Sequence, residues 1–161
     1  MATSTYVNIP PITGESTDVD HVDWIEVDSF SIGEAQAVSD VSASGGAGAS
    51  QAVFSPLSIT KVIDKASPDL NQYCAKGTNI AALELQVCME TGSKEWYVKI
   101  ELENVFVKSV YQNGGGLSRP TESVEFVYGK IKWDSKPIGS DGAAGGPAGP
   151  KGWSLQDGQP I

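Results

Sequence analysis

Residues 59–70 of the chain have the sequence ITKVIDKASPDL, in which a strand-like segment runs directly into the start of a helix. Ser67 is a suitable N-cap, because its hydroxyl oxygen can accept a hydrogen bond from a free N–H of the first helical turn. Pro68 then takes the first helical position, where its φ fits and its missing N–H removes no bond. Asp69 places negative charge against the positive end of the helix dipole. The stretch therefore predicts a strand followed by a capped helix.

The end of this helix is as well marked as its start. Lys76 places positive charge near the helix C-terminus, and Gly77 supplies a residue that tolerates the left-handed backbone conformation. We therefore predict one short α-helix over about residues 68–76, in a chain where few other segments have helical character.

Much of the remaining chain alternates between apolar and polar residues, as half-buried strands do. The alternation is regular in residues 81–89 and again in residues 96–102. After Glu103 and Asn104 the apolar positions change phase and continue at Val105. A strand cannot exchange its two faces without an irregularity, so we predict a bulge or a sharp bend at Glu103 and Asn104.

Two further predicted strands, residues 24–32 and residues 122–133, carry apolar side chains on both faces. An isolated sheet would leave one of these sets in water, so we interpret the pattern as a barrel bend, a subunit contact or a lumen wall. Residues 3–9 form another predicted strand, and Trp153 and Leu155 are expected to dock as a short final one. The fold class that follows is mainly β, an antiparallel β-barrel or sandwich with one short helix.

The composition excludes two classes of partner. The chain has 161 residues, of which 40% are hydrophobic, but no apolar run approaches the roughly 20 residues that span a bilayer, so we expect no membrane insertion. A formal net charge of −9 opposes binding to nucleic acid, whose affinity comes mainly from lysine and arginine contacts to phosphate. Lys130 and Lys132 lie on one face of a predicted strand, and we interpret them as protection of a sheet edge.

Two segments are rich in small residues, and we expect one domain over residues 1–161 that contains them. A Ser/Ala/Gly-rich loop at residues 38–52 and a Gly/Pro-rich C-terminal tether at residues 134–152 cannot bury enough apolar surface to offset the entropy of ordering. Both are expected to be flexible unless a neighbouring subunit holds them.

The inventory of reactive side chains argues against an enzyme. His21 is the sole histidine and is distant in sequence from Cys74 and Cys88, which fit no paired metal or redox motif and are expected to be free thiols. The acidic run at residues 18–23 lacks the glycine and the bidentate glutamate of a calcium loop, so we interpret it as a solvated loop. We expect no catalytic residue, no cofactor and no metal.

Several blocks of the chain together resemble the haemolysin-coregulated protein (Hcp) family, the tube protein of type VI secretion. The pattern T-K-x-x-D-K-x-[ST]-P-x-L followed by C-x-x-G is present in residues 60–77. Other blocks similar to the family occur in the same order at residues 14–18, 24–33, 107–110, 120–124 and 152–155. The resemblance spans nearly the whole chain.

The resemblance implies an assembly and a transport role. In the family, six subunits close into a hexameric ring, and rings stack into a tube that is surrounded by a contractile sheath and capped by a spike of VgrG-like proteins. The expected partners are therefore further copies of the chain, sheath and spike proteins, and secreted effector proteins held and chaperoned in the lumen. From the resemblance, Ser31 is the candidate lumen residue that contacts effectors; the alternative is a surface serine without a partner.

The N-terminus is compatible with such a route. Residues 1–10 have neither a basic region nor an apolar core, so no cleavable signal peptide is predicted. We expect synthesis in the cytoplasm and secretion to the extracellular space by a route that recognises folded or assembled protein.

The competing hypothesis is a monomeric β-barrel that binds a small ligand, with Trp96 or Trp133 lining a cavity. A phage tail-tube protein would share the ring architecture. An enzyme using carboxylates such as Glu15 or Asp18 has no support in the spacing of these residues.

Overall fold

The computed structural model describes residues 2–38, 49–90 and 94–161. Its elements follow the chain in an order dominated by strands, with one α-helix between the sixth and seventh of them in the described residues. They are β1 (Thr3–Asn8), β2 (Ile25–Val27), β3 (Ser29–Ser31), β4 (Glu34–Val38), β5 (Ala49–Phe54), β6 (Leu57–Val62), α1 (Ser67–Lys76), β7 (Ile80–Met89), β8 (Trp96–Asn113), β9 (Thr121–Ser135), β10 (Lys151–Ser154) and β11 (Gln159–Pro160).

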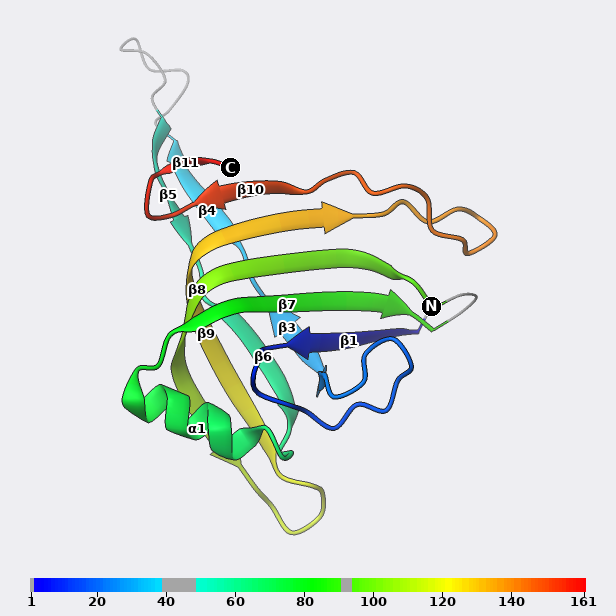
Figure 1. The fold of residues 1–161 in the computed structure, drawn as a ribbon, viewed down its shortest axis with the longest axis vertical. Helices are drawn as coiled ribbons and strands as arrows, with labels where there is room; N and C mark the ends of the chain where they lie inside the picture. Colours follow the sequence, from blue (N-terminus) through cyan, green and yellow to red (C-terminus); the bar gives the residue numbers. More distant parts are fainter. Residues whose placement is uncertain (1, 39–48, 91–93) are drawn as a thin grey trace.

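The principal sheet is antiparallel and curls into a barrel, as predicted (Figure 1). Strands β2, β1, β7, β8, β9 and β6 are hydrogen-bonded in that order, and β3 pairs with β6. Because β2 and β3 are separated only by Asp28, whose N–H donates to the Thr60 carbonyl oxygen at 2.8 Å, this short segment joins the two ends of the sheet.

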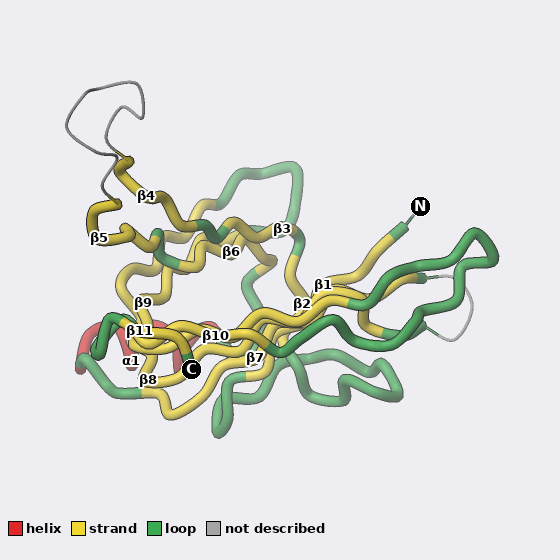
Figure 2. Tube along the Cα trace, turned by 90° about the horizontal axis from the view of Figure 1, so that it is seen from above, coloured by secondary structure: helices red, strands yellow, loops and turns green. Residues whose placement is uncertain are grey.

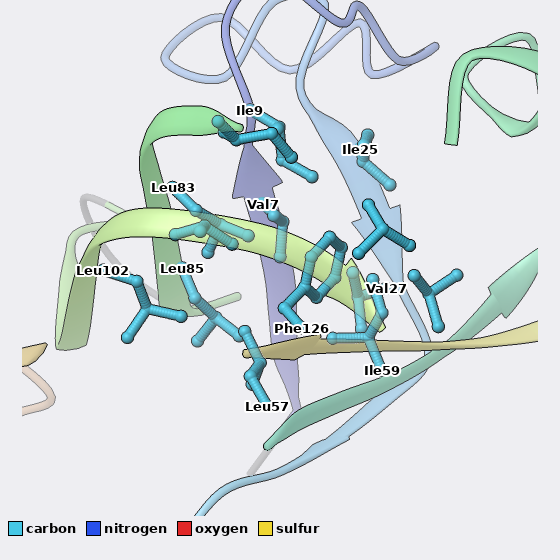
Figure 3. Packing of buried hydrophobic residues seen from close by; sticks show 14 of the residues in the cluster. Val7, Ile9, Ile25, Val27, Leu57, Ile59, Leu83, Leu85, Leu102 and Phe126 are labelled. Carbon is cyan, nitrogen blue, oxygen red and sulfur yellow. The ribbon is translucent and has the colours of Figure 1, made fainter. Parts of the chain in front are cut away.

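Aliphatic and aromatic side chains fill the barrel. Figure 3 shows Val7, Ile59, Leu85 and Phe126 directed into one interior, although they come from four different strands. All four are completely buried. Removal of this apolar surface from water is the main favourable contribution to folding.

The two longest strands reverse their faces at Asn104 and Gly129. Leu102 and Val105 of β8 are both fully buried although they are three positions apart, and Asn104 between them has φ 57°. Asn104 lies next to Gly129 of β9, where an added Cβ would come within 3.2 Å of the Asn104 Cβ. The predicted irregularity is thus confirmed as a bend, whereas the register shift between β8 and β9 lies further on, between Val107 and Ser109.

The predicted strand over residues 24–32 is divided at Asp28 into β2, which pairs with β1, and β3, which pairs with β6. Ile25 and Val27 of β2 are buried. Phe30 of β3, which the alternation would place on the opposite face, also packs against the core. The two-sided apolar pattern of this segment therefore reflects a change of pairing partner within one subunit.

The helix follows the prediction closely but starts one residue early. Pro68 is in its first turn, and it ends at Gly77 with φ 67°. The prediction that Ser67 is the N-cap was wrong, because Ala66 occupies that position and no side chain caps the helix. The Ser67 hydroxyl is used elsewhere: it accepts a hydrogen bond from the Asp64 N–H at 3.0 Å and donates to Glu122 Oε1.

These contacts belong to a buried ionic network at the start of α1. Lys61 and Glu122 are on neighbouring strands β6 and β9, their side chains are fully buried, and Lys61 Nζ is 2.5 Å from Glu122 Oε1. Lys61 Nζ also contacts Asp64 Oδ1 at 2.8 Å, and Gln112 Nε2 donates to Glu122 Oε2 at 3.1 Å. Burial raises the pKa of Glu122, but the hydrogen bonds from Lys61, Ser67 and Gln112 lower it by more. The network keeps Glu122 ionised inside the protein.

Strands β10 and β11 extend the principal sheet from β9, whereas β4 and β5 project from it (Figure 2). Strands β4 and β5 form a separate hairpin, so residues 49–52 of the predicted loop lie in a strand, while residues 39–48 fall outside the described residues. Residues 136–150 connect β9 to β10, which pairs with β9. Of the predicted final strand, Trp153 lies in β10, whereas Leu155 follows it and β11 is the last strand. The described residues include no helix long and apolar enough to cross a membrane.

The ionic network predicts a large effect of one substitution. Lys61→Met leaves the Glu122 carboxylate buried without its cation, so the free energy of unfolding should fall by about 3–5 kcal/mol in urea denaturation. The double variant Lys61→Met/Glu122→Gln should recover most of this loss. Lys130→Met is the matched control: Lys130 is partly exposed and 4.0 Å from Glu103, so its loss should change stability by less than about 1 kcal/mol. Equal effects of Lys61→Met and Lys130→Met would contradict a structural role of the network.

Candidate functional site: two faces of the barrel

Ser31 is exposed at the end of β3 and belongs to a surface composed almost entirely of hydroxyl groups. Two rows of directly paired residues cross four strands, from β3 through β6 and β9 to β8. We call this surface the hydroxyl face; its rows are Ser31, Ser58, Glu125 and Ser109, and Ser29, Thr60, Ser123 and Tyr111. The prediction singled out Ser31, and the register shows that it is one member of a set.

A second surface of the same barrel is charged. Its side chains come from β7 and from the parts of β8 and β9 beyond the bend at Asn104 and Gly129. We call it the charged face; it comprises Glu84, Lys99, Glu101, Glu103, Lys130, Lys132 and Asp134. The interpretation of Lys130 and Lys132 as protection of a sheet edge was wrong, because β10 pairs with β9 along these residues. Both lysines instead lie near Glu103, at 4.0 and 3.7 Å.

An apolar patch separates the two faces. Phe106 and Val127 are directly opposite each other on β8 and β9, and they are 36% and 37% exposed. Together with Leu155 they line a shallow cavity of about 270 Å³. Contiguous apolar side chains with a polar rim are a feature of protein–protein contact sites.

The acidic run at residues 18–23 is only partly solvated, contrary to the prediction. Asp20 is exposed, but His21 is 3% exposed and stacks on the Tyr6 ring at a centroid distance of 4.3 Å. His21 Nδ1 is 2.6 Å from Asp18 Oδ1, and Lys94 Nζ is 2.5 Å from Asp18 Oδ2. The hydrogen bonds from Lys94 and then from His21 lower the pKa of Asp18 from 3.8 to about 2.

The fold also brings His21 within 3.6 Å of the Cys88 sulfur, which superficially resembles a nucleophile with its base. Three observations exclude that chemistry. Cys88 is completely buried, and its burial raises the pKa of the thiol to about 11. His21 Nε2 is 2.8 Å from Gln86 Oε1, and Gln86 Nε2 donates to Glu84, so the amide oxygen faces the ring. Both ring nitrogens of His21 thus face oxygen atoms that are closer than the thiol sulfur, at 2.6 and 2.8 Å against 3.6 Å.

The geometry offers no alternative centre in the described residues. No group of three or more His, Cys, Asp or Glu side chains in that part of the chain is placed to hold a metal ion. Cys74 and Cys88 are both free thiols, as expected.

The ligand-binding barrel is not supported by its proposed tryptophans. The indole of Trp96 is flanked by the ammonium groups of Lys99 and Lys136, at 4.2 and 4.1 Å from the ring centroid. Trp133 packs against the rim of the core and lines an open surface groove of about 510 Å³. The barrel interior between these residues is occupied by buried hydrophobic side chains.

Comparison with known proteins assigns the fold to a family. The family model described as type VI secretion system effector, Hcp, matches residues 6–134, which include the barrel strands, α1 and the bend. The chain belongs to the Hcp family. It is similar to Protein hcp1 of Pseudomonas aeruginosa, with 34% identity over 158 residues and 97% of each chain covered. The Major exported protein of the same organism is 33% identical over 102 residues, which are 58% of this chain and 59% of that protein.

Solved structures agree with this assignment. A type six secretion system protein has 35% identity and a TM-score of 0.95, with 99% of this chain and 100% of that one covered. Hcp1 from Salmonella typhimurium shares the fold at 24% identity, with a TM-score of 0.76 and complete coverage of both chains.

Membership of the Hcp family explains why the described residues form distinct surfaces and no reaction centre. Hcp proteins are secreted tube components and effector carriers of the type VI secretion system; their role is structural and not enzymatic, and their fold forms hexameric rings. This chain therefore has that role. Sequence reasoning missed the partners of Ser31 and the His21 cluster, because both depend on register between distant strands. The only local sign of the cluster is the spacing of three residues between Asp18 and His21.

The Asp18 contacts predict a defined pH dependence. Since the folded-state pKa of Asp18 is lowered to about 2, its contribution to stability is present above the ordinary pKa of 3.8 and is lost as the pH falls toward about 2. Asp18→Asn should lower the unfolding free energy at pH 7, and the difference from the unaltered protein should shrink steadily below about pH 4. Urea denaturation over this range measures it, with the exposed Asp20→Asn as matched control. A difference independent of pH would contradict the role of the ionised carboxylate.

Proposed function

We propose that this chain acts as a single tube domain that closes into a homo-hexameric ring, that its rings stack, and that the hydroxyl face lines the lumen. Effector proteins held there contact Ser31, while the sheath and the VgrG-like spike engage the outside and the end of the tube. The protein is made in the cytoplasm and leaves the cell without cleavage of a signal peptide. Residues 136–150, between β9 and β10, contact neighbouring subunits.

The chemistry of the hydroxyl face is the observation that carries the lumen assignment. A wall that transports folded proteins must hydrogen-bond to many different surfaces without retaining them. Hydroxyl groups both donate and accept, and each neutral hydrogen bond contributes only about 0.5–1.5 kcal/mol in water. A charged wall would bind oppositely charged cargo tightly, and an apolar wall would hold any exposed hydrophobic side chain. The hydroxyl face therefore suits transient contact better than the charged face does.

The apolar patch supports closure into a ring. Phe106 and Val127 lie along the border of the hydroxyl face. We place the contact between neighbouring copies at this border. Contact there removes two half-exposed apolar side chains from water. A closed ring also satisfies every copy of the patch with the same contact.

Assembly is tested directly by mass and shape. Mass photometry should give particles of about six times the 16.9 kDa of one chain, and negative-stain images should show rings with an open centre. Phe106→Glu should weaken assembly, since it places a charge in the apolar patch, whereas Leu117→Glu at an exposed loop position is the matched control. A strictly monomeric species at every concentration would contradict the proposal and favour a barrel that acts alone.

Labelling of single cysteines with maleimide gold tests whether the hydroxyl face points into the lumen of the ring. In a Cys74→Ala background, the remaining native thiol of Cys88 is buried. Gold on Ser31→Cys should appear inside the central opening of the ring, and gold on Glu101→Cys, which marks the charged face, should not. The opposite distribution would show that the charged face lines the lumen.

A further inference from the structure

One carboxylate interrupts the hydroxyl face. Seven of the eight side chains in its two rows end in a hydroxyl group, and the eighth belongs to Glu125. Glu125 is in the same row as Ser31, with Ser58 between them. Since neighbouring strands are about 4.8 Å apart, Glu125 is roughly 10 Å from Ser31, within the footprint of one docked protein.

The existing partners of Glu125 hold it only weakly. Its side chain is 39% exposed, and Lys108 Nζ, on a side chain that is 55% exposed, is 4.0 Å from Glu125 Oε2. Lys108 occupies the position where the register between β8 and β9 shifts. Ser109 Oγ donates to the same oxygen at 3.3 Å. An exposed ion pair at this distance contributes little, so another cation can replace Lys108.

We propose that Glu125 determines which effectors the wall accepts, by selecting proteins that present lysine or arginine side chains to it. The inference rests on the proposed assignment of the hydroxyl face to the lumen. The seven hydroxyl groups bond equally well to donors and acceptors, so they do not discriminate between cargo surfaces. A carboxylate accepts a charge-assisted hydrogen bond from a cation, about twice as strong as a neutral one, and repels another carboxylate.

The net charge of the whole assembly also favours positively charged effectors. Each chain has a formal net charge of −9, and a narrow passage surrounded by such subunits concentrates positively charged molecules. Within that general attraction, Glu125 supplies the specific point of contact next to Ser31. Six-fold repetition would place one such carboxylate on every subunit around the lumen.

The test uses two probes of the same fold and opposite charge, lysozyme, which is basic, and α-lactalbumin, which is acidic. Fluorescence anisotropy of each labelled probe is measured against assembled rings at low salt. The unaltered rings should bind lysozyme more tightly than α-lactalbumin. Glu125→Gln should weaken lysozyme binding about fivefold, equivalent to about 1 kcal/mol, and should reduce its dependence on salt.

Glu101→Gln is the matched control, because it removes the same charge from the charged face, on the neighbouring strand β8. It should change lysozyme affinity by less than about twofold. Lysozyme binding that is absent from unaltered rings, unchanged by Glu125→Gln, or reduced equally by Glu101→Gln would overturn the inference. Mass photometry of each variant confirms that the rings are intact.

The outcome separates this inference from the function on which it rests. If gold on Ser31→Cys lies outside the central opening, the lumen assignment itself is wrong. If the gold lies inside and Glu125→Gln binds lysozyme as the unaltered rings do, only the role of Glu125 is refuted.

Discussion

Strands β8 and β9 exchange their inner and outer faces at Asn104 and Gly129, and the two surfaces of the barrel depend on this reversal. An L-residue at positive φ is unfavourable, but asparagine tolerates it better than most residues. Gly129 leaves the room that Asn104 needs on the adjacent strand. Both strands therefore turn together, and each contributes to the charged face on one side of the bend and to the hydroxyl face on the other. A barrel of straight strands would carry a single pattern along its whole length.

The buried Lys61–Glu122 ion pair holds the barrel strands to the start of α1. It connects β6 with β9 and, through Ser67 and Asp64, fixes the start of α1. A buried ion pair contributes little net stability compared with apolar side chains of equal size, but removal of one partner leaves an uncompensated charge. The network thus specifies how the helix joins the barrel more than it strengthens it. The same strand that carries Glu122 inward presents Ser123 and Glu125 outward.

The polar interior groups of this protein are structural, in agreement with its place in the Hcp family. His21, Asp18 and Cys88 lie together, but Cys88 is buried with a raised thiol pKa, and the ring nitrogens of His21 face Asp18 and Gln86. Other molecules can contact only the surface of the barrel. That surface is divided into the hydroxyl face, the charged face and the apolar patch of Phe106 and Val127. A secreted tube component interacts through such faces with copies of itself and with cargo.

Local structure could be predicted from the sequence, because it depends on neighbours only a few residues away. The alternating strands, the helix over about residues 68–76, the phase change at Asn104 and the free thiols all follow from such patterns. Only the tertiary structure decided what each side chain meets. Ser67 contacts Glu122 across 55 residues, and His21 contacts Gln86 and Cys88 across 65 and 67 residues. Those contacts, and the row that places Glu125 beside Ser31, depend on strand register, which is set by the barrel as a whole and not by any one segment.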